Sequence, residues 1–344
     1  MADIANDPRL DPRIKAFLLS APIDISLSCP VDNREALIEI ENSPEAQARG
    51  QAMAQALEAM DVESITPDAG LRISTYSLSS EPDGNMVNIQ FIRPDNEERL
   101  PCVYYIHGGG MASLSCFVGN YRAWGKMIAH QGVAVAMIDF RNSLTPSSVP
   151  EIVEFPGGLN DCVSGLKWVA ANADTLNIDA SRIVISGDSG GGNLTIATGM
   201  KLVRDGGIEL VKGLYALCPY ISGVWPDERY PSSSINNGIL IGVSSEWGRL
   251  SYSPSAWDDR DPLAWPGFAT EDDVQRFPPT VISVNECDPL CDEGVAFYRL
   301  LNRAGVQARC RMLMGTCHAI EIFPPVAPDI ATSTAREIAA FCTL

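Results

Sequence analysis

From about residue 71 onward, short apolar segments alternate with longer segments whose apolar residues recur at helical spacing. Period-two alternation in residues 71–79 and 85–93 predicts two strands joined by a turn at Pro82-Asp83-Gly84. Further strands are predicted at 102–106, 133–140, 182–186, 211–218, 280–286 and 307–314, and helices at 121–130, 158–173, 193–204, 293–304 and 328–341. This alternation predicts an α/β fold in which helices cover both faces of a mostly parallel sheet.

Two stretches depart from the alternation. Residues 8–60 are rich in Ala, Glu and Gln and predict helices at 14–19 and 34–60. Residues 221–277 are rich in Ser, Pro, Trp and Asp and contain no clear strand; so long a connection is usually functional, often a lid. We therefore predict N-terminal cap helices in 1–70, an α/β core in 71–220 and 278–344, and a cap insertion in 221–277.

The charge of the chain limits its partners. Its 344 residues carry 25 basic and 43 acidic side chains, a net charge of −18, and no basic cluster occurs. This sign opposes binding to DNA, RNA or anionic lipid, whose phosphates attract Lys and Arg. A hydrophobic fraction of 46% is typical of a globular protein. We expect a small-molecule partner, no nucleic acid and no membrane.

The N-terminal segment and the cysteines predict a cytoplasmic protein. The segment Met-Ala-Asp-Ile lacks the basic and apolar regions of a signal peptide, and no apolar run reaches the roughly 18–20 residues of a membrane span. Ten cysteines are spread through apolar segments, where a reduced thiol behaves as a small buried hydrophobe. The pairs Cys287/Cys291 and Cys310/Cys317 lack zinc-site spacing, so we expect no metal site.

The strongest chemical signal is the run Gly187-Asp188-Ser189-Gly190-Gly191, which lies between a predicted strand and a predicted helix. This is the motif G-x-S-x-G in its strand–turn–helix context. The serine of such a motif sits on a sharp, strained turn, so the residues two before and two after it must be small. The alternative is a plain glycine-rich turn. The flanking strand and helix favour the prediction that Ser189 is a nucleophile.

A second signal is His107-Gly108-Gly109-Gly110, directly after the predicted strand 102–106. Consecutive glycines let backbone N–H groups approach a ligand closely, and such preorganised donors stabilise the oxyanion that acyl transfer generates. We predict an oxyanion hole formed by the N–H groups of Gly108, Gly109 and Gly190. The alternative is a flexible loop, but ligand sites of α/β proteins form where this loop lies, at the carboxyl end of a strand.

A nucleophilic serine needs a general base, and the base needs an orienting carboxylate. In this fold class the chain order is Ser, then Asp or Glu, then His, and His318 is the only histidine after Ser189. It follows the last predicted strand. The acid should follow the strand before that one, where Asp288 fits best. Glu286 and Asp292 are alternatives, because predicted strand ends shift by about two residues.

The other two histidines have simpler predicted roles. His107 should shape the glycine loop through hydrogen bonds. His130 lies at a predicted helix end, where imidazole suits the helix dipole.

Together these motifs resemble the bacterial hormone-sensitive-lipase-like (family IV) carboxylesterases of the α/β-hydrolase superfamily. The residues concerned are His107–Gly110, Gly187–Gly191, Asp288-Pro289-Leu290 and His318, with additional similarity at 140–142 and 155–161. The resemblance covers about residues 75–322. It implies an α/β-hydrolase fold with a mostly parallel eight-stranded sheet, helices on both faces and a helical cap. It also implies no cofactor, hydrolysis of short-acyl esters, and a homodimer as a family expectation.

The chain departs from the family's pattern at Met111, Gly190 and Ala319-Ile320. Because the family places these positions near the acyl pocket and cap, they affect substrate choice more than the reaction. We predict a serine carboxylesterase that uses Ser189, His318 and Asp288. One alternative is an amidase or arylformamidase with the same residues. Another is a noncatalytic receptor like the gibberellin receptors, which typically lack the histidine that is present here.

The large aromatic residues of 221–277 have two candidate roles: they either line the substrate pocket or pack the cap. These residues are Trp225, Tyr230, Trp247 and Trp265. Packing is favoured because Trp is usually largely buried.

Overall fold

One eight-stranded sheet forms the centre of the molecule. A computed structural model describes residues 3–20, 25–26 and 29–343, and its main sheet has the order β10-β9-β7-β6-β4-β5-β3-β2. The strands are β2 (Leu71–Ser79), β3 (Met86–Pro94), β4 (Leu100–Ile106), β5 (Ala134–Asp139), β6 (Ile178–Asp188), β7 (Gly213–Leu217), β9 (Thr280–Asn285) and β10 (Ala308–Leu313). Only the β2–β3 and β3–β5 pairs in this sheet are antiparallel, which confirms the mostly parallel eight-stranded sheet.

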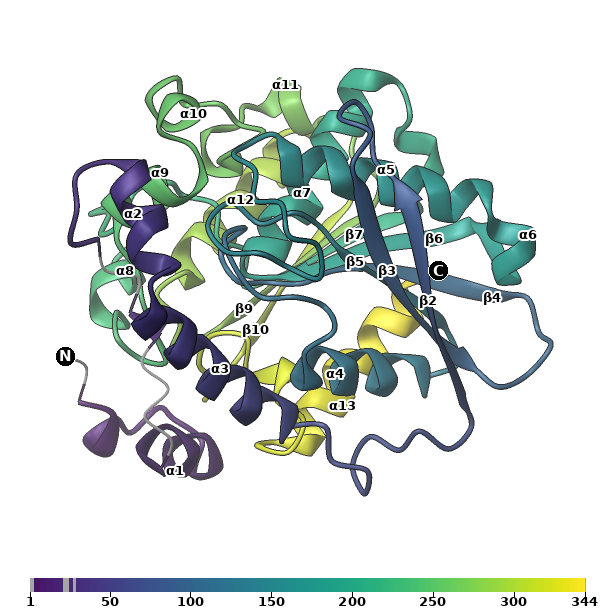
Figure 1. Cartoon of the computed structure of the whole chain (residues 1–344), viewed down its shortest axis with the longest axis horizontal. Helices are drawn as coiled ribbons and strands as arrows, with labels where there is room; N and C mark the ends of the chain where they lie inside the picture. Colours follow the sequence, from purple (N-terminus) through teal and green to yellow (C-terminus); the bar gives the residue numbers. More distant parts are fainter. Residues whose placement is uncertain (1–2, 21–24, 27–28, 344) are drawn as a thin grey trace.

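Helices cover both faces of this sheet (Figure 1). In Figure 1, α4 and α13 lie on one face, and α5, α7 and α12 lie on the other. The helices of the core are α4 (Gly119–Ala129), α5 (Gly157–Ala171), α6 (Ala173–Leu176), α7 (Gly190–Asp205), α12 (Cys291–Arg303) and α13 (Pro328–Phe341). The other helices are α1 (Pro12–Ser20), α2 (Arg34–Glu41), α3 (Pro44–Glu58), α8 (Ser232–Ile235), α9 (Ser245–Tyr252), α10 (Pro254–Asp258) and α11 (Glu271–Val274). No helix in the described part of the chain is both long enough and apolar enough to cross a membrane.

Four of the inner strands are buried along their whole length because they are covered on both faces. Every residue of β4, β5, β7 and β9 is buried, as near-continuous apolar segments of a parallel sheet should be. The carboxyl ends of parallel strands lie at one edge of the sheet, so the loops after β4, β6, β9 and β10 meet there. These loops carry the residues that the sequence singled out.

The single helix predicted at 34–60 is wrong, because the structure divides it into α2 and α3. Pro44 is the first residue of α3, and proline interrupts the backbone hydrogen bonding of a preceding helix. The Ser43 side chain accepts a hydrogen bond from the Ala46 N–H, which caps the new helix.

The N-terminal segment and residues 221–277 are in contact. The short strand β1 (Ile25–Ser26) pairs in parallel with β8 (Ile241–Gly242), and α2 packs beside α9 (Figure 1). The Arg34 guanidinium of α2 donates to the Leu250 carbonyl of α9 at 2.9 Å. Helix α3 instead contacts α4 of the core. The predicted units also include residues 1–2, 21–24, 27–28 and 344, which lie outside the described residues.

Candidate active site

Ser189 occupies the sharp turn between β6 and α7. Its φ of 55° and ψ of −118° are strained for a residue with a side chain, at a cost of order 1–3 kcal/mol. A Cβ on Gly191 would lie 2.0 Å from the Ile106 carbonyl oxygen, and one on Gly187 would lie 2.4 Å from the Gly191 carbonyl oxygen. Both positions therefore require glycine, which is the physical reason for the G-x-S-x-G spacing.

The structure brings Ser189, His318 and Asp288 into one hydrogen-bonded chain. The His318 Nε2 atom lies 2.9 Å from Ser189 Oγ, and His318 Nδ1 lies 2.8 Å from Asp288 Oδ2. The other Asp288 oxygen accepts the Leu290 N–H at 2.9 Å, so the carboxylate is held in place. Asp288 and His318 are buried, whereas Ser189 is half-buried. With the proton on Nδ1, His318 presents a lone pair to the serine hydroxyl.

The two alternative acids are engaged elsewhere. A Glu286 carboxylate oxygen accepts the Gly315 N–H at 2.7 Å, and an Asp292 oxygen accepts the Ser232 N–H at 2.8 Å. The structure therefore favours Asp288 as the partner of His318.

The electrostatics around His318 favour proton uptake. Burial, the largest single influence, disfavours a charged imidazole, but the charge of Asp288 and its hydrogen bond, together with the charges of Asp188 and Glu321, raise the pKa of His318 above its ordinary value. This arrangement can accept a proton from Ser189 and stabilise the imidazolium that results.

Gly108, predicted as an oxyanion donor, has its N–H engaged by a tyrosine. Its N–H donates to the Tyr121 hydroxyl at 2.7 Å, in a buried position. That hydroxyl in turn donates to an Asp188 carboxylate oxygen at 3.0 Å. The N–H of Gly108 is therefore already engaged, which argues against its predicted role as an oxyanion donor. The sequence could not reveal this, because the acceptor comes from α4.

Gly109 and Gly110 differ from Gly108. Within the described residues, neither of their N–H groups donates to another backbone group. Both glycines have positive φ, 97° and 64°. A Cβ on Gly190 would lie 2.8 Å from the Gly110 nitrogen and 2.6 Å from the Met111 nitrogen, so the loop approaches the start of α7 very closely. This contact explains why glycine follows Ser189 in this chain.

A buried carboxylate joins the serine turn to the glycine loop, and the sequence did not reveal this role. Asp188 accepts hydrogen bonds from the Tyr105 hydroxyl at 2.8 Å and the Tyr121 hydroxyl at 3.0 Å. Burial raises the pKa of Asp188 to about 6, although both tyrosine bonds favour its ionised form. The two tyrosines lie in the predicted strand before the glycines and in the predicted helix after them, and their positions in the sequence do not show that they meet Asp188.

The other histidines take the simpler roles. The His107 ring stacks on Phe140 with centroids 4.4 Å apart, and its Nδ1 lies 2.8 Å from the Gly108 carbonyl oxygen. Burial lowers the pKa of His107, so the neutral ring packs inside the glycine loop. His130 follows the last residue of α4, and its Nε2 lies 2.9 Å from the Pro67 carbonyl oxygen.

The large aromatic residues of 221–277 have three different surroundings. Trp225 stacks on Tyr220 at 4.2 Å, and Trp265 meets Trp225 edge-on at 5.5 Å, so these two tryptophans pack together. The Arg229 guanidinium lies 5.1 Å from the centre of the Tyr230 ring. Trp247 instead lies against the glycine loop, at Gly110.

One group of side chains has the chemistry of metal ligands. The ligand atoms of Cys218, Asp288 and His318 all lie within 4.8 Å of one another, and the three residues are buried. Asp288 and His318 already hydrogen-bond to each other and to the serine. Two of these three potential ligands, Asp288 and His318, are therefore already engaged in the hydrogen-bonded chain with Ser189.

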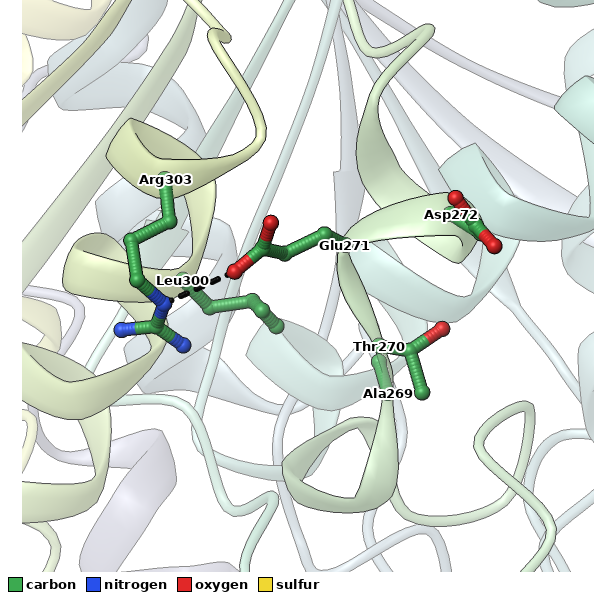
Figure 2. A pocket seen from close by; sticks show the side chains of 6 residues that line it. All are labelled: Ala269, Thr270, Glu271, Asp272, Leu300 and Arg303. Atoms are coloured by element: carbon green, nitrogen blue, oxygen red, sulfur yellow. Dashed lines mark hydrogen bonds and ion pairs between the residues drawn. The ribbon is translucent and has the colours of Figure 1, made fainter.

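A surface hollow lies away from this site. Figure 2 shows its lining, in which the Arg303 guanidinium donates to the Glu271 carboxylate at 2.9 Å. Its other lining residues are Ala269, Thr270, Asp272 and Leu300. None of them belongs to the hydrogen-bonded chain of Ser189, His318 and Asp288.

Comparison with known proteins gives consistent matches. The model of the alpha/beta hydrolase fold family matches residues 103–322. The solved structure of esterase Est22 is 59% identical, with a TM-score of 0.95 and 99% of each chain covered. Brefeldin A esterase, described as a bacterial homologue of human hormone sensitive lipase, is 33% identical, with a TM-score of 0.85 and coverage of 98% and 94%. Ethyl acetate hydrolase of Pseudomonas putida is 27% identical over 251 residues, covering 72% of this chain and 74% of the relative.

The fold, the serine turn and these matches define the class: the chain belongs to the alpha/beta hydrolase fold family. Within that family it is a hormone-sensitive-lipase-like, family IV esterase. It is accordingly a carboxylic ester hydrolase, as the resemblance of its motifs implied.

Proposed function

We propose that the protein hydrolyses short-chain acyl esters through an acyl-enzyme formed on Ser189. The observation that carries the proposal is the hydrogen-bonded chain from Asp288 through His318 to Ser189, with distances of 2.8 and 2.9 Å. In this proposal Ser189 Oγ attacks the ester carbonyl carbon while His318 Nε2 takes the hydroxyl proton. Asp288 holds the imidazole in the required tautomer.

The remaining steps use the same groups, with His318 now acting first as an acid and then again as a base. His318 gives its proton to the alkoxide oxygen, the carbon–oxygen bond to the alcohol breaks, and the alcohol leaves. Water, deprotonated by His318, then attacks the acyl-enzyme carbonyl and releases the acid, with the proton returning to Ser189. No other protein group needs to transfer a proton.

We assign the oxyanion hole to the N–H groups of Gly109, Gly110 and Gly190. Gly109 and Gly110 have backbone donors that are not used by other backbone groups in the described residues, and Gly190 begins α7 beside them. Donors at a helix N-terminus and in a rigid loop are preorganised for developing negative charge. Gly108 supports them through Tyr121 instead of donating directly.

We further propose that residues 1–70 and 221–277 together form a cap over the core of 71–220 and 278–344. The β1–β8 pair and the α2–α9 contact join the two segments, which supports this assignment. A relative whose name gives ethyl acetate as its substrate favours small acyl and alcohol groups here.

A direct test compares an ester with its amide counterpart. With purified protein, we expect p-nitrophenyl acetate to be hydrolysed with a kcat/KM at least 100-fold above that of p-nitroacetanilide. A preference for the anilide would favour the amidase alternative. Absence of turnover of both, together with absence of fluorophosphonate labelling, would favour the noncatalytic receptor and overturn the proposal.

The pH dependence of kcat/KM follows from the raised pKa of His318. Only neutral imidazole can accept the proton of Ser189, so activity should fall as pH decreases through a pKa above the ordinary 6.5. Initial rates with p-nitrophenyl acetate from about pH 5 to pH 9 measure this acid limb of the pH profile, the range in which activity falls. A profile that stays flat well below pH 6.5 would contradict the assigned base.

A further inference from the structure

Trp247 lies directly on the glycine loop. A Cβ built on Gly110 would lie 3.0 Å from Cη2 and 3.1 Å from Cζ3 of Trp247, so the wide end of the indole covers this glycine. The residue comes from α9, far from the loop in sequence, and is only 6% exposed. Gly110 is also next to Met111 and the start of α7, so the indole lies beside the proposed oxyanion hole.

The helix that carries this indole is held in place by a cluster of aromatic side chains. A Cβ on Gly248 would lie 3.0 Å from the ring of Trp225 and 3.0 Å from the Tyr220 hydroxyl, so α9 is seated on the packed aromatic cluster. The indole N–H of Trp225 donates to the buried Glu293 carboxylate of α12 at 2.7 Å. The aromatic cluster is thereby anchored to the core, and it holds α9, the helix that carries Trp247, in place.

The strand order separates two sides of Ser189. Asp288 and His318 follow β9 and β10, which lie on one side of β6, whereas the glycine loop follows β4 on the other side. The leaving alcohol must face His318 to receive its proton. The acyl chain therefore points away from His318, toward the side of the glycine loop and the indole.

We propose that Trp247 is the wall of the acyl pocket and limits the length of the acyl chain that this esterase accepts. The inference rests on the proposed acyl-enzyme mechanism at Ser189. A rigid indole beside the carbonyl leaves room for a short acyl group, and a longer chain would have to displace it. The alcohol lies on the other side of the carbonyl and should be insensitive to this residue.

The test is the acyl-chain profile of Trp247→Ala. With p-nitrophenyl esters from acetate to dodecanoate, the ratio of kcat/KM for octanoate to that for acetate should rise about tenfold or more over wild type. One substrate methylene in an apolar pocket is worth about 10- to 200-fold, and removal of the indole opens room for more than one. A series of alkyl acetates with lengthening alcohols should keep the wild-type profile. If the alanine variant does not fold, Trp247→Leu replaces it in the test. This variant retains an apolar side chain and should shift the profile in the same direction.

Trp257→Ala provides the matched control. Trp257 is a half-buried indole of α10 whose N–H donates to the Gly223 carbonyl, so its loss removes a tryptophan from the same segment without touching the glycine loop. This variant should keep the wild-type acyl profile. An unchanged profile in folded Trp247 variants, or a shift confined to the alcohol series, would overturn the inference while leaving the esterase proposal intact. Failure of the wild type to hydrolyse any acetate ester would instead refute the proposed function.

Discussion

Ser189→Ala is expected to lower kcat for p-nitrophenyl acetate by about 10⁵- to 10⁶-fold, the scale of nucleophile loss in serine hydrolases. The reason is that no other group in the hydrogen-bonded chain with His318 and Asp288 can form the acyl-enzyme. Steady-state kinetics of the purified variant, with a melting curve to confirm folding, measure this effect.

Ser186→Ala is the matched control for that substitution. Ser186 lies on β6 three residues earlier, and its buried hydroxyl has no hydrogen-bond partner within the described residues. Its loss should leave kcat within about twofold of wild type, because no native hydrogen bond is removed. Wild-type turnover by the Ser189 variant would refute its role as nucleophile.

Asp288→Asn is expected to reduce kcat by about 10⁴-fold, as loss of the orienting carboxylate does in a serine triad. The Asn oxygen would accept the Leu290 N–H, and its amide would face His318 Nδ1 as a donor. His318 would then carry its proton on Nε2 and could not accept the proton of Ser189.

The pH profile of Asp288→Asn distinguishes this role from a structural one. Loss of the carboxylate removes the charge that raises the pKa of His318, so the acid limb of the residual activity should move to lower pH. Glu286→Gln should retain most activity and the wild-type limb, since Glu286 bonds to the Gly315 N–H instead. A loss of activity in the Glu286 variant equal to that in Asp288→Asn would contradict the assignment.

The sheet and the hydrogen-bonded chain could be predicted because their signals are local. Short apolar segments predict buried parallel strands, and the glycines at 187 and 191 reflect steric contacts that exclude any Cβ. Chain order then left a single histidine for Ser189. The choice of Asp288 over Glu286 rested on strand register. In the structure β9 ends at Asn285, so Asp288 lies in the loop beyond it and hydrogen-bonds to His318.

The sequence alone could not show which N–H groups of the glycine loop are free of other hydrogen bonds. Three consecutive glycines offer three N–H groups, and the pattern does not say which of them is already hydrogen-bonded. That depends on Tyr121, which reaches Gly108 from α4, and on Asp188, which accepts the hydrogen bond of Tyr121. A contact between elements decides the outcome.

The roles of the tryptophans in 221–277 were hidden for the same reason. Composition indicated packing, and Trp225 and Trp265 do pack together with Tyr220. Trp247 is also a tryptophan of this segment, but its position on α9 places its ring against Gly110. Irregular segments lack the periodicity that would place a side chain on a particular face.

The central claim is that the acyl-enzyme forms on the hydroxyl oxygen of Ser189. Fluorophosphonate labelling followed by peptide mass spectrometry tests it most directly. The reagent phosphonylates a serine that an adjacent base has activated. We expect one adduct per chain on Ser189 of the wild type, and no adduct on Ser189→Ala. An adduct on any other residue of the wild type, or undiminished labelling of the variant, would contradict the mechanism.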